Sequence, residues 1–190
     1  QTRAWLDKNG PLAATYTAFS GKPTDDRDLE RGGAGRNVLV NLFAYRTADT
    51  RKERDKRLAG LEASLGAFAR HEPALRATMH RYTPSGKEPH FYQPVGDSDV
   101  AGLAPYYYPS AIPRVIEGYA AVLADPAVRA DPKRLARAQE GYRTVRDGLL
   151  KEFDLKTGLR EPLRRDLPWF YTLLGTGLAE VAALDAGGVK

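Results

Sequence analysis

Apolar residues recur at helical spacing in the first third of the chain, and this predicts two amphipathic helices there. The first is expected from about Ala34 to Arg46, and the second follows Thr50 and stops before Pro73. Apolar side chains three or four residues apart fall on one face of a helix, and a proline disfavours helical backbone in the residue before it. Only the turn Ala48-Asp49-Thr50 separates the two helices. We therefore expect an antiparallel helical hairpin.

The same spacing returns in the second half of the chain, where it predicts two further strong helices. One begins near Ser110, with Pro113 in its first turn, and is broken by Asp125-Pro126. The next opens at Asp131-Pro132, because aspartate is a favoured N-cap and proline suits the first helical position. The segment from Phe153 to Leu159, which contains Gly158, is expected to be a turn.

A last helix is expected from near Pro168 to Gly187-Gly188, and residues Ala74 to Tyr82 could form one more short helix. The segment from His90 to Tyr108 is expected to be a loop. The pattern predicts a mainly α protein of antiparallel helical hairpins, arranged as a partial α/α toroid or as a helical bundle, in one domain spanning residues 1–190. The side chains expected in its core are Leu42, Phe43, Leu61, Leu65, Ile116, Tyr119, Tyr142, Leu149, Leu173 and Leu178.

Composition narrows the functions that this chain can perform. It has no cysteine, which excludes a disulfide framework, a thiolate metal site and a cysteine nucleophile. No apolar run approaches the ~20 residues that span a bilayer. The first residue is Gln1 rather than methionine. A cleaved export signal would explain this start, and so would another trimming of the sequence upstream. We expect the protein to be exported, either to the periplasm or by secretion.

The chain carries a net charge of +5 at pH 7, and its isoelectric point of about 9.4 permits an acidic partner. That partner could be an anionic polysaccharide, a nucleic acid or a membrane surface. The basic residues of the chain are interspersed with acidic ones and do not follow one stripe along a helix. Nucleic acid is therefore the least favoured of these partners.

Motifs for metal, triad and phosphate chemistry are absent from the sequence. The three histidines, His71, His80 and His90, form no paired ligand motif, and no serine lies in a Gly-x-Ser-x-Gly elbow. Gly32-Gly33-Ala34-Gly35 lacks the lysine of a phosphate-binding loop, so a tight turn that brings the helix close to a neighbour explains it better. We expect no metal ion and no cofactor.

Aromatic and acidic residues gather before the helix expected at Ser110. Tyr92 precedes an acidic stretch that contains Asp97 and Asp99, and Tyr106 and Tyr107 follow it. Sugar rings pack their C–H faces on aromatic planes, and their hydroxyls need carboxylate partners, so this combination fits a glycan cleft. The alternative is that two tyrosines belong to the core and that an aspartate caps the next helix.

Glu30 lies just ahead of the glycine turn and supplies a second acidic position. Glycoside hydrolysis needs two carboxyl groups, one protonated as the acid and one ionised as the base. In an α/α toroid the loops at one end form the cleft, so Glu30 could meet Asp97 and Asp99 there. The alternative is that these are ordinary acidic residues at helix starts, where the helix dipole favours them.

The order of these features resembles glycoside hydrolase family 8, the bacterial cellulase and chitosanase family of α/α toroids. Trp5 with Asp7-Lys8-Asn9-Gly10 resembles its first motif, and Leu29-Glu30-Arg31-Gly32 resembles the segment that bears its acid. The stretch from Gly96 to Val100 resembles a later cleft loop, and residues 166–184 resemble a later helix. Leu29 replaces the family's serine before the acid, and the chain has about half a toroid's length.

Two hypotheses on function follow. The first is a carbohydrate-active protein that hydrolyses a β-linked polysaccharide with inversion, with Glu30 as acid, Asp97 or Asp99 as base, and Tyr92, Tyr106 and Tyr107 binding the substrate. The alternative is a non-catalytic helical binding module for a polysaccharide or a partner protein. Because a half toroid would leave apolar helix faces exposed, we also expect a second copy or a companion chain.

Overall fold

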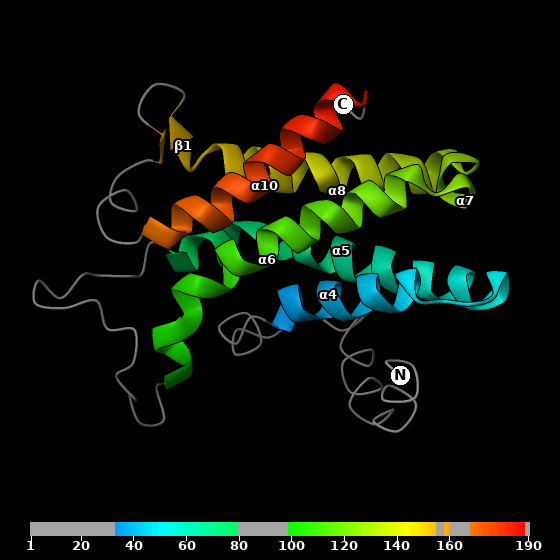
Figure 1. Ribbon diagram of the computed structural model, residues 1–190, viewed down its shortest axis with the longest axis horizontal. Coiled ribbons are helices and arrows are strands. Elements are labelled where there is room, and N and C mark those ends of the chain that lie inside the picture. Colours follow the sequence, from blue (N-terminus) through cyan, green and yellow to red (C-terminus); the bar gives the residue numbers. More distant parts are fainter. Residues whose placement is uncertain (1–32, 80–98, 155–157, 160–167, 189–190) are drawn as a thin grey trace, which may run out of the picture.

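The computed structural model describes residues 33–79, 99–154, 158–159 and 168–188 (Figure 1). The protein is mainly α, as the sequence predicts. The helices are α4 (Gly33–Arg46), α5 (Arg51–Met79), α6 (Asp99–Ala124), α7 (Pro126–Arg129), α8 (Pro132–Leu150) and α10 (Pro168–Ala186). Two short antiparallel strands, β1 (Phe153–Asp154) and β2 (Gly158–Leu159), lie where the sequence predicts a turn.

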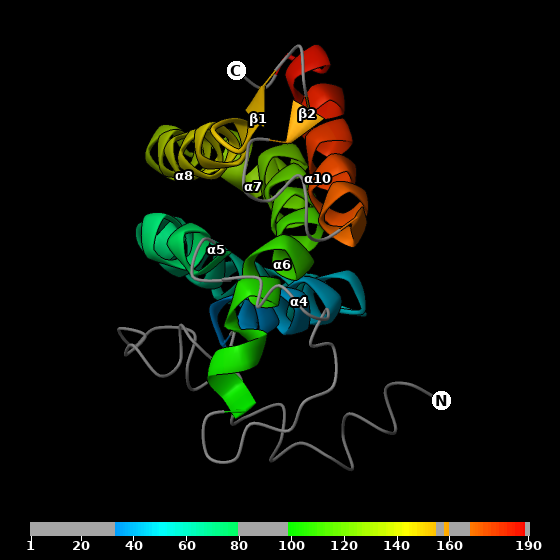
Figure 2. The same ribbon diagram turned by 90° about the vertical axis from the view of Figure 1, so that its left-hand side faces the viewer.

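Helix α6 lies at the centre of the described part of the molecule. The helices α4, α5, α7, α8 and α10 all pack against it, and the view along the helices in Figure 2 shows α4 and α5 on one side and α8 and α10 on the other. Neighbouring pairs α4–α5, α5–α8 and α8–α10 also contact each other. This arrangement is a bundle around one central helix, and the partial toroid stays a prediction.

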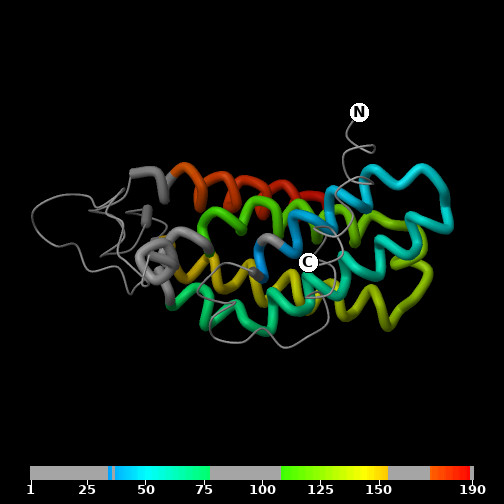
Figure 3. The backbone as a smooth tube through the Cα atoms, turned by 90° about the horizontal axis from the view of Figure 1, so that it is seen from below, coloured from blue at the N-terminus to red at the C-terminus, as the bar shows by residue number. Residues whose placement is uncertain are grey.

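The predicted hairpin is confirmed, because α4 and α5 pack side by side and are joined by a short turn (Figure 3). Two predicted helix boundaries are confirmed as well. Asp125 is the N-cap of α7, and Asp131 is the N-cap of α8, where its carboxylate accepts hydrogen bonds from the backbone N–H of Lys133 and Arg134 at 2.9 and 3.2 Å. These caps satisfy backbone donors that a helix start leaves free. None of the described helices is long and apolar enough to cross a membrane.

The prediction that the second helix ends before Pro73 is wrong, because α5 continues through this proline to Met79. A proline inside a helix removes a hydrogen bond and costs about 3 kcal/mol. Pro73 is exposed, whereas Phe68 and Leu75 on either side of it are buried at 1% and 2% exposure. Burial of apolar side chains beyond the proline therefore offsets its cost.

The start predicted for the next helix is also wrong, because α6 begins at Asp99 rather than near Ser110. Residues 99–108 are helix and not loop, and Pro113 lies in the middle of α6. Tyr108 and Ile112 are fully buried one helical turn apart. The apolar stripe therefore begins before Ser110, and its packing keeps the helix continuous through its prolines.

Most of the predicted core is confirmed, but Phe43 is exposed and two further residues are only partly buried. Helix α4 buries Ala34, Val38 and Leu42, which lie four residues apart on one face, but Phe43 is 40% exposed. A residue one position further along a helix points about 100° away, so Phe43 falls outside the contact that α4 makes with α5 and α6. The predicted core residues Leu173 and Leu178 are only partly buried. The other predicted core residues are buried: Leu42, Leu61, Leu65, Ile116, Tyr119, Tyr142 and Leu149.

Glycines allow two helices to approach the same turn of α6. A β-carbon at Gly35 of α4 would overlap the Cβ of Ala111, and one at Gly177 of α10 would overlap Ile112. The close contact at Gly35 agrees with the tight approach that the glycine turn suggests. By contrast, a β-carbon at Gly175 would meet no atom within 4 Å.

We expect Leu65→Ala to lower the free energy of unfolding by about 2–5 kcal/mol, because it empties space in a close-packed core. Leu65 is 1% exposed. Phe43→Ala is the matched control on a half-exposed side chain and should cost clearly less. Urea unfolding of both variants measures the difference, and an equal loss would show that the core is placed wrongly.

Two glycines of helix α10 allow a second comparison of matched substitutions. Gly177→Ala should destabilise the protein by about 1–3 kcal/mol, because the added methyl group overpacks the contact with Ile112. Gly175→Ala adds the same methyl group in open space, where alanine stabilises a helix by about 0.5–1 kcal/mol. Thermal unfolding should therefore shift in opposite directions for the two variants, and a shared direction would contradict this packing.

Candidate functional site

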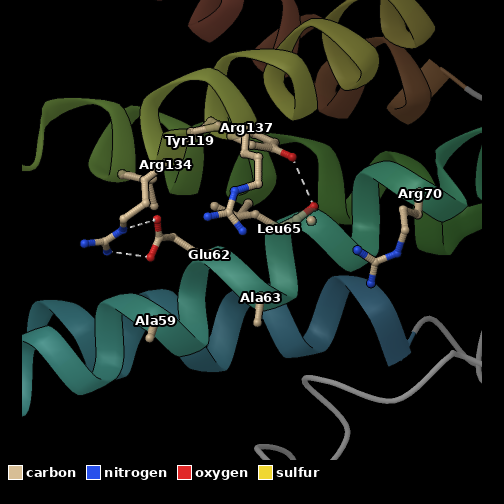
Figure 4. A pocket seen from close by; sticks show the side chains of 11 residues that line it. Ala59, Glu62, Ala63, Leu65, Arg70, Tyr119, Arg134 and Arg137 are labelled. Carbon is tan, nitrogen blue, oxygen red and sulfur yellow. Dashed lines mark hydrogen bonds and ion pairs between the residues drawn. The ribbon is translucent and has the colours of Figure 1, made fainter. Parts of the chain in front are cut away.

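A groove of about 350 Å³ lies between α5 and α8 (Figure 4). The lining residues of each helix recur at successive turns, so each helix presents one continuous face to the groove. Helix α5 contributes Ala59, Glu62, Ala63, Leu65, Gly66 and Arg70; α8 contributes Arg134, Arg137 and Ala138; and α6 contributes Tyr119 and Val122 behind them. The groove therefore has small residues along its length and charged side chains at its walls.

The back of the groove is held rigidly by Tyr119. Its hydroxyl donates a hydrogen bond to the backbone oxygen of Leu65 at 3.0 Å, and the residue is 2% exposed. Gly141 of α8 makes room for this hydroxyl, because a β-carbon there would overlap it. Burial raises the pKa of Tyr119. The phenol thus joins α5 to α6 and stays protonated near neutral pH.

The two walls of the groove are joined by an ion pair between α5 and α8. Arg134 donates from Nε to Glu62 Oε1 at 3.0 Å and from Nη2 to Glu62 Oε2 at 2.6 Å. The hydrogen bonds to Glu62 raise the pKa of Arg134. Two parallel bonds between a guanidinium and a carboxylate fix direction as well as distance. This pair therefore sets the spacing of the two helices at this end of the groove.

Arg70 and Arg137 are the other cations of the groove. Both are exposed, and in Figure 4 their guanidinium groups lie beside the opening between the helices. Arg137 donates from Nε to the backbone oxygen of Lys133 at 3.4 Å. Among the described residues, no carboxylate lies within ion-pair distance of either arginine. Both guanidinium groups can therefore bind an oxyanion from solution.

A second charged cluster is buried where α5, α6 and the end of α8 meet. Glu72 and Glu152 are each 2% exposed, and Arg76 bridges them with bonds of 2.9 and 2.8 Å. The hydroxyl of Tyr108 donates to Glu72 Oε1 at 2.8 Å. Burial raises the pKa of Glu72, although the bonds from Tyr108 and Arg76 act against this rise. Since the carboxylates are sealed from solvent, this cluster links helices instead of contacting a ligand.

A third cluster joins α4, α6 and α10. Glu117 accepts hydrogen bonds from Arg46 and, at 2.7 Å, from Arg114. Burial alone would raise the pKa of Glu117, but these bonds outweigh it and lower the pKa. Burial, together with the charge of Glu117, raises the pKa of Glu180 on α10. Glu117 is therefore the more acidic of the two carboxyl groups, and the buried Oε2 of Glu180 has no hydrogen-bond partner among the described residues.

The described residues do not test the glycan cleft that the sequence suggests. Glu30, Tyr92 and Asp97 lie outside the described residues. Asp99 is the first residue of α6, and Tyr106 and Tyr107 follow in the same helix, but their side chains are also outside the described part. Hydrolysis by Glu30 with Asp97 or Asp99 therefore stays a prediction.

Sequence reasoning missed the groove between α5 and α8. Glu62 and Arg134 are 72 positions apart, and nothing local indicates that they meet. The available signal was the three- and four-residue spacing of small and charged residues on the polar faces of both helices. Within the described residues, no group of three acidic or histidine side chains could hold a metal ion.

Comparison with family models, with curated proteins and with solved structures gave no match for this chain. The resemblance to glycoside hydrolase family 8 stays a prediction, and function has to be argued from the groove.

The two opposite pKa shifts predict opposite responses to pH. The pKa of Glu72 is raised, so its contribution to stability is present at low pH and is lost as the pH rises through the folded pKa. The pKa of Glu117 is lowered, so its contribution is present above the unfolded value of about 4.3 and is lost on acidification. On acidification the parent protein should therefore gain stability relative to Glu72→Gln and lose it relative to Glu117→Gln.

Urea unfolding across the acid range checks both signs, and each variant serves as the control for the other. Glutamine preserves the shape of glutamate and does not ionise in this range. The same sign for both variants would contradict the two environments described above.

Proposed function

We propose that this chain is a carbohydrate-active protein that acts as a non-catalytic helical binding module and holds a polysaccharide in the groove between α5 and α8. The observation that supports the proposal is the groove itself, about 350 Å³ in volume, in which small residues alternate with hydrogen-bonding side chains. Ligand sites are concave and orient the ligand with a few fixed polar groups.

The shape of the groove suits a chain molecule. From Ala59 to Arg70 its α5 wall extends over ~16 Å, since a helix rises ~1.5 Å per residue. The small side chains of Ala59, Ala63 and Gly66 leave space along this wall. An extended ligand of a few sugar units would lie against them without displacing a large side chain.

The polar groups of the groove match the groups of a sugar. A sugar hydroxyl both donates and accepts hydrogen bonds, so its site needs both kinds of partner. Arginine side chains supply donors, and the carboxylate of Glu62 supplies acceptor lone pairs beyond the two bonds that it receives from Arg134. The ion pair also holds Glu62 in place, which lowers the entropy that binding would cost.

The same geometry favours binding over hydrolysis in this groove. Glycoside hydrolysis needs two carboxyl groups on opposite sides of the scissile bond, and Glu62 is the one carboxyl group among the described lining residues. Both of its oxygens accept from Arg134. Hydrolysis, if the protein performs it, would require the separate set of Glu30 with Asp97 or Asp99.

Filling the groove should weaken binding of a polysaccharide. Ala63→Trp places a large ring against the wall of the groove, and we expect at least a roughly tenfold loss of affinity, which corresponds to about 1.4 kcal/mol. Ala74→Trp is the matched control, because Ala74 is an exposed residue of the same helix that does not line the groove. Affinity electrophoresis through gels that contain neutral or acidic polysaccharides measures both variants.

The control variant should migrate like the parent protein in every gel. Equal retardation of both tryptophan variants, with unchanged helical circular dichroism, would remove the α5–α8 groove as the binding site. Absence of retardation of the parent protein in all gels would contradict a polysaccharide-binding function.

A further inference from the structure

We infer that the ligand of the α5–α8 groove is an anionic polysaccharide, in which carboxylate or sulfate groups on the sugars are bound by Arg70 and Arg137. This inference rests on the proposed polysaccharide-binding function and names the class of ligand. It follows from the positive charge of the groove, from the lack of a carboxylate partner for two of its arginines among the described residues, and from the oxyanions that a guanidinium prefers to bind.

The groove has an excess of positive charge. Its lining contains three arginines and one glutamate, so its formal charge is three minus one, or +2. Glu62 neutralises Arg134 in a bidentate pair. The excess therefore belongs to Arg70 on α5 and Arg137 on α8, which stand on opposite walls of the groove. A neutral sugar chain would leave this charge without a partner.

Other arginines of the same two helices form ion pairs with carboxylates of this protein. Arg76 of α5 bonds to Glu72 and Glu152, and Arg146 of α8 bonds to Asp147 at 2.9 Å. Arg70 and Arg137 have no such carboxylate among the described residues. A guanidinium binds carboxylate and sulfate through two parallel hydrogen bonds, because its donors form a planar fork. Acidic sugar substituents offer this geometry at regular intervals along a chain.

The same lining argues against nucleic acid. Proteins that bind single strands stack the bases on exposed aromatic rings, whereas the one aromatic ring of the described lining, Tyr119, is 2% exposed and has its hydroxyl bonded to Leu65. This buried ring cannot pack on a sugar face either, so a polysaccharide would be held here through its hydroxyls and acidic groups. The carboxylate of Glu62 can accept a hydrogen bond from a sugar hydroxyl. A ligand that carries both oxyanions and hydroxyls therefore uses every polar group of the groove.

Two matched ligand pairs test the inference directly. Polygalacturonate and its methyl-esterified form share one backbone and differ in charge, and dextran sulfate and dextran form the corresponding sulfate pair. The parent protein should bind at least one charged member roughly tenfold more tightly than its neutral partner. This preference should shrink as salt is added, because salt screens exposed charges.

The double variant Arg70→Ala/Arg137→Ala should lose this preference. The control variant Arg54→Ala/Arg143→Ala removes the same charge from the same two helices, at exposed residues that do not line the groove, and should keep the preference. An equal loss in both double variants would show that net charge alone attracts the polymer, and this would overturn the site.

The remaining outcomes separate this inference from the proposed function. Equal affinity for the charged and neutral members of both pairs would overturn the inference and leave a polysaccharide-binding module. No binding to any of the four polymers would overturn both. Tighter binding to a single-stranded oligonucleotide or to polyglutamate than to either charged polysaccharide, lost in Arg70→Ala/Arg137→Ala, would assign the groove to a different class of polymer.

Discussion

Close packing around α6 is the constraint on which the other features of this protein depend. Helices α4 and α10 reach adjacent residues of α6, Ala111 and Ile112, from two directions. Each can do so only because it presents a glycine, Gly35 or Gly177, at the crossing. A helix that is surrounded on several sides must be apolar over most of its surface. In α6 the buried apolar side chains accordingly recur at every turn from Tyr108 to Leu123.

Tyrosine hydroxyls that are buried or partly buried form hydrogen bonds between the packed helices. Tyr119 bonds across to the backbone of α5 at Leu65, and Tyr142 of α8 bonds to Asp185 of α10 at 2.9 Å. Tyr45 of α4 bonds to Asp125 at 2.6 Å, and burial with this bond raises the pKa of Tyr45 to about 12. Apolar packing tolerates small sliding, whereas a buried hydroxyl needs its partner in one place. These bonds therefore fix how far each helix is shifted along its neighbour.

The groove follows from the same arrangement. Helices α5 and α8 both pack against α6 and also contact each other, and small residues such as Ala63 and Ala138 leave a groove open between them. The Glu62–Arg134 pair then holds the two walls at a fixed distance. A site built on helices is positioned more precisely than one built on loops.

The sequence by itself determined the helical class, the hairpin of α4 and α5, and the boundaries at Asp125 and Asp131, because periodicity and capping are local properties. It could not place the start of α6 or the passage of α5 through Pro73, where burial against distant helices outweighs a local preference. It pointed to Glu30 for chemistry and missed the groove. Only the tertiary structure decided that Glu62 and Arg134 meet. These residues are 72 positions apart, and they come together because their helices pack on α6, which no local pattern of the sequence indicates.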